Sequence, residues 1–157
     1  MPFPMEDQIM DFWCWAAVSA AAEKYFDPQT KKTQCSIASY VKGIDCCLQA
    51  AMCDEADSLE LALNKIGRLR EPVVDGPIPF NLIRKEIRDG LPVAARIGWL
   101  GGGGHFVVIT GYRIYPSREA VLKIADPLGT GGLWLYNDFT NAYQLTGEWT
   151  HTYFLRP

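Results

Sequence analysis

The chain has 157 residues and a formal net charge of −3, from 15 Lys and Arg against 18 Asp and Glu. This mild acidity argues against nucleic-acid binding, because no basic surplus is present to neutralise phosphates. No apolar run approaches the roughly 18 residues of a membrane-spanning helix, so we expect no contact with a membrane, and the length fits a single domain.

The first half of the chain has helical patterns. Its N-terminal segment MPFPMED has neither a basic flank nor an apolar run, so we expect no signal peptide there. An Ala-rich run of high helix propensity follows and stops at Asp27-Pro28, Gly43 marks the end of a second run, and Ser58 is a suitable N-cap for a third. Four helices are predicted, over 13–26, 34–42, 58–66 and 81–90.

The second half consists of short runs that are rich in β-branched and aromatic residues and are separated by Gly or Pro. Five strands are predicted, over 91–99, 105–114, 120–126, 132–136 and 150–156. Helices followed by strands predict an α+β fold rather than an alternating, doubly wound one. We expect the junction between the two halves in the proline-rich loop at 70–79 or just after Gly90.

The five cysteines divide by position, because Cys14 stands alone and the other four fall within 19 residues of one another. Four clustered thiols can form two disulfides, bind zinc or be buried as apolar groups. The cluster lacks the paired spacing of zinc sites, so we favour two disulfides and predict no metal site. The pairing stays open, although adjacent cysteines are the least expected pair. The disulfide candidates are Cys35, Cys46, Cys47 and Cys53.

Cys14 is the candidate nucleophile. It lies at the start of the first predicted helix, where the helix dipole and unpaired backbone N–H groups favour a thiolate. A thiolate is the reactive form of cysteine, so this is where a nucleophile is expected. The alternative is a small buried side chain, which is the more common fate of a lone cysteine.

His105 is the candidate base. It opens a predicted strand directly after four glycines, and Gly104 beside it leaves room for a substrate to approach closely. Asp126 ends the next predicted strand, so it can reach His105 and orient the imidazole if the two strands pair. Gln8, six residues before Cys14, could donate a hydrogen bond to an oxyanion, and Trp99 could line a substrate cleft.

These residues together resemble the papain-like cysteine proteases, and most closely the compact bacterial C39-like and AvrRpt2-like (C70) families. The resemblance spans about residues 8–155. It implies an N-terminal helical half over about 8–90 that packs on a C-terminal antiparallel β-sheet or half-barrel over about 91–157. Together they form a single catalytic domain, 1–157, with the active-site cleft between the halves. The motifs that carry it are Gln8-x5-Cys14-Trp15-Ala16, Gly104-His105-Phe106-Val107-Val108 with Gly111-Tyr112, and Asp126-Pro127.

The resemblance implies a cysteine endopeptidase that hydrolyses peptide bonds through a thioester and needs no cofactor. Cys14 would attack, His105 would act as general base and acid, Asp126 would orient the imidazole, and Gln8 would help hold the oxyanion. The third member is asparagine in papain itself, whereas aspartate suits the compact families. The alternatives are a deamidase, transglutaminase or acyltransferase with the same chemistry, or a binding module that keeps only the fold.

The resemblance also bears on context. Compact relatives include secreted bacterial proteases and effector or toxin domains, so we expect a protein that is secreted or delivered by a secretion system into another cell. The expected partners are a protein or peptide substrate and an inhibitor or immunity protein. Disulfides would fit an oxidising location.

Overall fold

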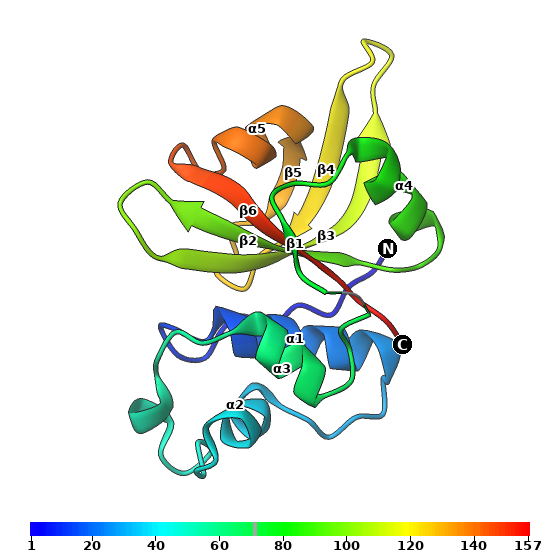
Figure 1. Ribbon diagram of the computed structural model, residues 1–157. Coiled ribbons are helices and arrows are strands. Elements are labelled where there is room, and N and C mark those ends of the chain that lie inside the picture. The colour runs from blue at the N-terminus through cyan, green and yellow to red at the C-terminus, as the bar shows by residue number, and fades with distance from the viewer. Residues whose placement is uncertain (71) are drawn as a thin grey trace.

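An antiparallel sheet with strand order β1-β6-β2-β3-β4-β5 separates two groups of helices in the computed structural model, which describes residues 1–70 and 72–157 (Figure 1). The helices are α1 (Cys14–Phe26), α2 (Gln34–Lys42), the short 3-10 helix η1 (Ala50–Cys53), α3 (Leu59–Lys65), α4 (Phe80–Arg88) and α5 (Tyr136–Asn141). The strands are β1 (Val74–Asp75), β2 (Val93–Trp99), β3 (Gly104–Ile114), β4 (Ala120–Ala125), β5 (Gly132–Leu135) and β6 (Gly147–Phe154). The predicted α+β class is confirmed.

Each face of the sheet has its own core, because side chains alternate along a strand. On β3, Phe106 and Val108 pack with α1, α2 and α3, whereas Val107 and Ile109 pack with α4 and α5. Figure 1 shows these two helical layers on opposite sides of the sheet. No helix in the described part of the chain is long and apolar enough to cross a bilayer.

The position of α4 differs from the expected division into halves at about residue 90. This helix precedes β2 in the chain, yet Ile83 is buried in the same core as Val93 and Ile109, on the face of the sheet opposite α1. The cause is its apolar face, which Leu82, Ile83 and Ile87 form at helical spacing. Helix α4 therefore belongs to the layer on the face of the sheet opposite α1, although it lies within the predicted N-terminal half.

Helix α1 is buried along most of its length, and the two tryptophans at its start tie it to the loop that follows η1. The indole N–H of Trp13 donates to the Cys53 carbonyl at 2.8 Å, and that of Trp15 donates to the Glu55 carbonyl at 3.0 Å. Both indoles have no exposed surface. These two hydrogen bonds fix the N-terminus of α1 relative to the segment 53–57.

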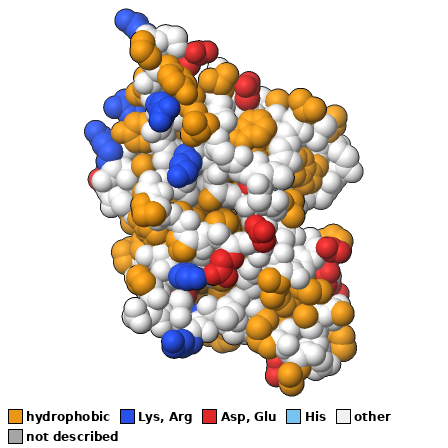
Figure 2. All heavy atoms as spheres, turned by 180° about the vertical axis from the view of Figure 1, so that it is seen from behind, with side chains coloured by type: hydrophobic (Ala, Val, Ile, Leu, Met, Phe, Trp, Pro, Cys, Tyr) orange, Lys and Arg blue, Asp and Glu red, His pale blue; other side chains and the backbone are white. Residues whose placement is uncertain are grey.

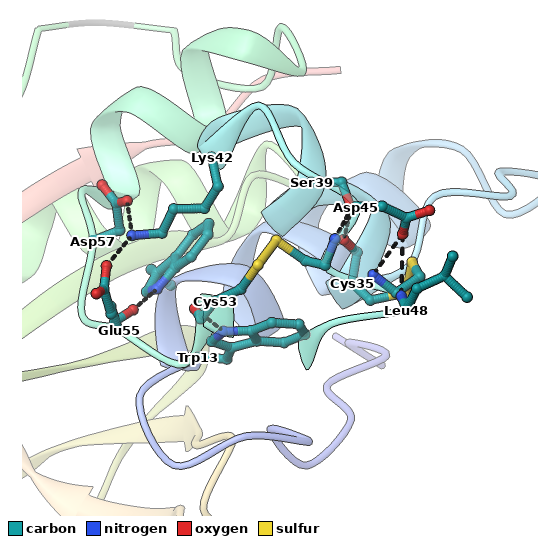
Figure 3. The surroundings of a disulfide bond; sticks show 12 residues. Trp13, Cys35, Ser39, Lys42, Asp45, Leu48, Cys53, Glu55 and Asp57 are labelled. Carbon is teal, nitrogen blue, oxygen red and sulfur yellow. Dashed lines mark hydrogen bonds and ion pairs between the residues drawn. A yellow bond between two sulfur atoms is a disulfide. The ribbon is translucent and has the colours of Figure 1, made fainter. Parts of the chain in front are cut away.

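The four clustered cysteines form two disulfides, Cys35–Cys47 and Cys46–Cys53 (Figure 3). Cys46 and Cys53 are fully buried, whereas Cys47 is exposed. The buried bridge connects the loop after α2 with Cys53, whose carbonyl accepts the Trp13 hydrogen bond. The bridge therefore holds in place the residue to which the start of α1 is hydrogen-bonded.

Removing the buried bridge with the double substitution Cys46→Ala/Cys53→Ala should lower the free energy of unfolding by about 2–3 kcal/mol, because the unfolded chain regains the entropy of a short closed loop. The control is Cys35→Ala/Cys47→Ala, which opens a loop with a sequence separation of 12 rather than 7, on the exposed side. Urea denaturation should give similar losses for both. The reaction of Cys14 with iodoacetamide should change only in the first variant, and equal rates in both would contradict a link between this bridge and the start of α1.

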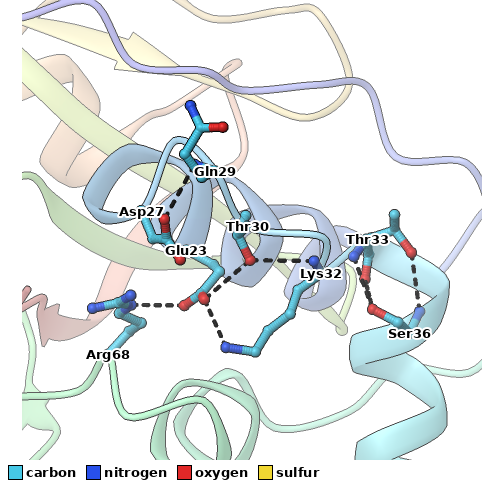
Figure 4. A network of polar contacts seen from close by, with 8 residues as sticks. All are labelled: Glu23, Asp27, Gln29, Thr30, Lys32, Thr33, Ser36 and Arg68. Carbon is cyan, nitrogen blue, oxygen red and sulfur yellow. Dashed lines mark hydrogen bonds and ion pairs between the residues drawn. The ribbon is translucent and has the colours of Figure 1, made fainter.

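The buried carboxylate of Glu23 stabilises the C-terminal part of α1. The Glu23 carboxylate is 2% exposed and accepts hydrogen bonds from Arg68 at 2.7 Å, Lys32 at 2.6 Å and Thr30 at 3.2 Å (Figure 4). Burial alone would raise the pKa of Glu23, but the hydrogen bonds and charges of Arg68 and Lys32 outweigh burial and lower it. Glu23 thus joins α1 to the segments before α2 and after α3.

We expect Glu23→Gln to lower the free energy of unfolding by about 1–3 kcal/mol at neutral pH, because two cations lose their partner at a buried site. The loss should shrink below about pH 4.5, since a carboxylate with a lowered pKa contributes stability only while it is ionised in the folded state. Glu6→Gln is the control, because Glu6 forms an equally short but exposed pair with Lys24. Urea denaturation at several pH values should show little change for Glu6→Gln, and an equal loss in both variants would refute the effect of burial.

Candidate active site

Cys14 is the first residue of α1 and the free cysteine of the chain. Its side chain is 8% exposed and lines a small cavity of about 120 Å³ together with Gly104 at the start of β3. The first turn of a helix of this length presents unpaired N–H groups and the positive end of the helix dipole, both of which favour a thiolate. The location suits a nucleophile.

His105 and Asp126 are brought together by the pairing of β3 with β4. The antiparallel register places Val108 opposite Ala125, so Asp126 follows at the end of β4 where it can reach back to His105. His105 Nε2 lies 2.7 Å from Asp126 Oδ1, and both residues are at least 95% buried. Because Nε2 faces Asp126, Nδ1 is the ring atom that remains for other partners.

The electrostatics of this pair favour a protonated imidazole. Burial by itself would lower the pKa of His105, but the hydrogen bond with Asp126 and the interaction with Cys14 outweigh it and raise the pKa to about 9. Burial would raise the pKa of Asp126, and the bonds from His105, Tyr143 and the Leu128 N–H lower it instead. At neutral pH an imidazolium is therefore favoured, which is held by Asp126 at Nε2 and interacts with Cys14.

Three more groups hold Asp126, and the sequence did not point to them. Tyr143 donates its hydroxyl to Oδ2 at 2.6 Å, Thr130 donates to the same oxygen at 3.0 Å, and the Leu128 N–H donates to Oδ1 at 2.8 Å. Tyr143 lies just after α5 and is fully buried. The carboxylate is thus fixed in one orientation, with Oδ1 toward the imidazole.

We expect Tyr143→Phe to lower the free energy of unfolding by about 1–3 kcal/mol, because a buried hydrogen bond to a charged group is lost. The pKa of Asp126 should rise, so acid unfolding should begin at a higher pH than in the wild type. Tyr153→Phe is a matched control, since Tyr153 is 5% exposed and its hydroxyl has no hydrogen bond to the described residues. Unfolding followed against pH should separate the two variants; identical acid transitions would contradict the role of Tyr143.

Trp99 and Gly104 are both predicted to contact substrate, and the structure places them differently. The Trp99 ring stacks on the imidazole with ring centroids 6.3 Å apart, and it also stacks on Tyr143 at 6.4 Å. It is not among the described residues that line the cavity at Cys14, whereas Gly104 is. Trp99 therefore covers the histidine, and its predicted contact with substrate stays a prediction.

Gln8 lies in the segment before α1, beside the Asp126 turn. Its backbone N–H donates to the Pro127 carbonyl at 2.8 Å. Both hydrogens of its side-chain amide are engaged, since Nε2 donates to the carbonyls of Met10 at 2.9 Å and Asp11 at 2.6 Å. An oxyanion would have to compete with these carbonyls, so the predicted role of Gln8 stays a prediction.

The cysteine comes from a helix and the histidine from a strand of the sheet. The two residues meet where that helix packs on the sheet. This arrangement is characteristic of the papain-like cysteine proteases. The amino-acid sequence leads to the same class, because residues 1–138 match the family described as papain-like cysteine protease AvrRpt2. The chain belongs to this AvrRpt2 family of papain-like cysteine proteases. Of the two compact families that the motifs resemble, the match is to the AvrRpt2-like one. No curated protein matches the sequence.

Proposed function

We propose that this protein is a cysteine endopeptidase that hydrolyses peptide bonds of protein substrates, with Cys14 as the nucleophile. The observation that carries the proposal is the buried pair of His105 and Asp126 beside a free cysteine at a helix N-terminus. With Nε2 held by Asp126, the imidazole can exchange its Nδ1 proton only on the side away from the aspartate, which is the arrangement that a general acid and base needs.

The reaction would proceed through a thioester. The Cys14 thiolate forms a bond to the carbonyl carbon, and the electrons of the C=O bond move to the oxygen. The backbone N–H of Cys14 is suited to stabilise that oxyanion, with Gln8 as the proposed second donor. The C–N bond then breaks, and the amine leaves with the proton from His105. Finally water attacks the thioester, His105 takes its proton, and the carboxylic acid is released as Cys14 returns to thiolate.

The test is the mass spectrum of a protein substrate after incubation with the enzyme. Unfolded casein is a suitable probe, since extended chains expose many peptide bonds. We expect fragments whose masses add up to the intact protein plus one water for each cut, and none after prior alkylation of Cys14 with iodoacetamide. Internal cuts, rather than loss of terminal residues, would support an endopeptidase. Fragments that persist after alkylation would refute the assignment of Cys14.

The other thioester chemistries give different products in the same experiment. A deamidase would leave the chain intact with a small change in mass, and a transglutaminase or acyltransferase would join it to an added amine. A binding module without catalysis would give no product at all, and Cys14 would then react with iodoacetamide no faster than an ordinary thiol. Any of these outcomes would replace the proposed hydrolysis.

We further propose that the protein acts outside the cell that makes it, either secreted or delivered into another cell. The two disulfides support an oxidising environment, since such bonds are rare in reducing compartments. Thiol titration of the unfolded, unreduced protein purified from its native location should find one free cysteine. Five free thiols would contradict secretion into an oxidising environment and leave delivery into the cytosol of another cell. An inhibitor or immunity protein remains a proposed partner, which co-purification with the catalytically inactive protein would test.

A further inference from the structure

The cavity at Cys14 lies beside a larger groove. Besides Cys14 and Gly104, the cavity is lined by Trp15, and it shares Ala56, Asp57, Arg96 and Phe106 with a neighbouring groove of about 550 Å³. The two spaces are therefore adjacent, and both are bordered by these four residues. The groove runs between the segment that follows η1 and the strands β2, β3 and β6. From behind, Figure 2 shows an indentation between the upper and lower parts of the molecule.

Arg96 is the cation that both spaces share. It lies on the central strand β2, opposite Phe106 on β3 and His151 on β6. Its guanidinium lies directly against the backbone of Gly104, because a Cβ at that glycine would be 2.6 Å from Nη2 and 2.7 Å from Cζ. The absence of a side chain at position 104 therefore allows the guanidinium to lie next to the residue that precedes His105.

The guanidinium of Arg96 has hydrogen-bonding capacity to spare. Nη1 donates to the Thr150 hydroxyl at 3.0 Å, and among the described residues no carboxylate lies within ion-pair distance. Two other partly buried arginines are paired with a carboxylate, Arg68 with Glu23 and Arg70 with Glu86, whereas Arg84 is also partly buried and lies over the Tyr112 ring. Among the described residues, the Thr150 hydroxyl is thus the one acceptor to which the Arg96 guanidinium donates, and the planar fork of its N–H groups matches a carboxylate.

The acidic side chains near the groove do not neutralise Arg96. Asp57 lines the cavity, but its carboxylate is 2.9 Å from Lys42, which also bridges to Glu55 (Figure 3). Glu60 is exposed and lines only the wider groove. Close to Cys14, the uncompensated charge is therefore positive.

We propose that Arg96 determines substrate specificity by binding the carboxylate of an aspartate or glutamate side chain within two residues of the scissile bond. The proposal rests on the proposed peptidase function. An extended peptide advances about 3.3 Å per residue and its side chains alternate, so a cavity that contains Cys14 receives a side chain close to the bond that is cut. An isolated guanidinium in a partly apolar pocket favours an anionic side chain over a neutral one.

The test is cleavage of a complex mixture of chymotryptic peptides from a denatured bacterial lysate, with the cut sites identified by mass spectrometry. The wild type should show enrichment of Asp and Glu at one position within two residues of the cut. Arg96→Gln should lower kcat/KM for a peptide with Asp or Glu at this position by about 10- to 100-fold, the range for a hydrogen bond to a charged group. The kcat/KM for the same peptide with Asn or Gln at this position should stay nearly unchanged. Arg96→Glu should shift the preference at this position to Lys and Arg.

Arg88→Glu is the matched control, because Arg88 is exposed on α4, lies outside the groove and undergoes the same change of charge. It should keep the wild-type cleavage profile. The rate at which iodoacetamide alkylates Cys14 shows for each variant that the site is intact. Cleavage by the wild type without acidic preference, or an acidic preference that persists in Arg96→Glu, would overturn the role of Arg96 and leave the peptidase standing. No cleavage by a wild type whose Cys14 reacts normally would overturn the peptidase and, with it, this proposal.

Discussion

Cys14→Ala is expected to lower the rate of peptide-bond cleavage by about 10⁵-fold or more, because no thioester can form without the sulfur atom. The fold should survive, since the substitution removes one atom from a side chain that lines a cavity, and we expect a loss of stability of about 1 kcal/mol or less. Initial rates on fluorescently labelled casein, together with thermal unfolding, measure both effects. A variant that folds and retains a hundredth of the wild-type rate would refute Cys14 as the nucleophile.

The same variant provides a test of the interaction between Cys14 and His105. The interaction with Cys14 is one of the causes that raise the pKa of His105 to about 9. In Cys14→Ala this pKa should therefore be lower, although the Asp126 hydrogen bond should still keep it above that of an ordinary histidine. NMR titration of the imidazole measures it, and His151 serves as an internal reference. An unchanged pKa would mean that the thiol does not act on the imidazole.

Local sequence signals were sufficient for the parts of the site that lie on long elements. The Ala-rich run predicts α1, and with it a cysteine at a helix N-terminus, to within one residue. Side chains alternate along a strand, and on β3 the face of Val107 and Ile109 is indeed separate from that of Phe106 and Val108. A hairpin between consecutive strands is the commonest sheet connection, so the pairing that joins His105 to Asp126 was also accessible.

The rest of the site depends on contacts that no local pattern encodes. Helix α5 has six residues, too few for a periodic signal, and it delivers Tyr143 to an aspartate 17 positions earlier. The turn after Tyr143 contains Gln144 and Leu145 at positive φ. Residues other than glycine rarely adopt this conformation, and secondary-structure propensities do not predict it. In the sequence, Arg96 resembles any polar residue of a strand. Only the packing of its guanidinium on Gly104 shows that the side chain lies along the groove.

Asp126→Asn is expected to move the alkaline limb of the kcat/KM profile, which should lie near pH 9 in the wild type, to a lower pH. The hydrogen bond with Asp126 is the largest of the contributions that raise the pKa of His105, and the charge of Asp126 raises it further; the amide keeps only the hydrogen bond. The imidazolium that protonates the leaving amine is then lost earlier as the pH rises. At neutral pH we expect kcat/KM to fall by about 10- to 100-fold. This fall is smaller than the one known for replacing the aspartate beside the histidine of a Ser-His-Asp triad.

The hydrogen bonds around residue 126 explain why this substitution should preserve the geometry. The amide oxygen can take the place of Oδ1 and accept from His105 and the Leu128 N–H, while the amide nitrogen faces the hydroxyls of Tyr143 and Thr130. Hydroxyls can accept as well as donate, so each contact has a partner of the right kind. Asp126→Ala lacks all of these contacts and should lose activity by about 10³-fold or more.

The same shift has a consequence for stability. A histidine whose pKa is raised on folding stabilises the folded state fully below its unfolded value of about 6.5, and the contribution disappears as the pH rises through about 9. Wild-type stability should therefore decline over this range more steeply than that of Asp126→Asn, as urea denaturation at each pH would show. Parallel declines, together with an alkaline limb that does not move, would mean that Asp126 orients the imidazole without setting its charge.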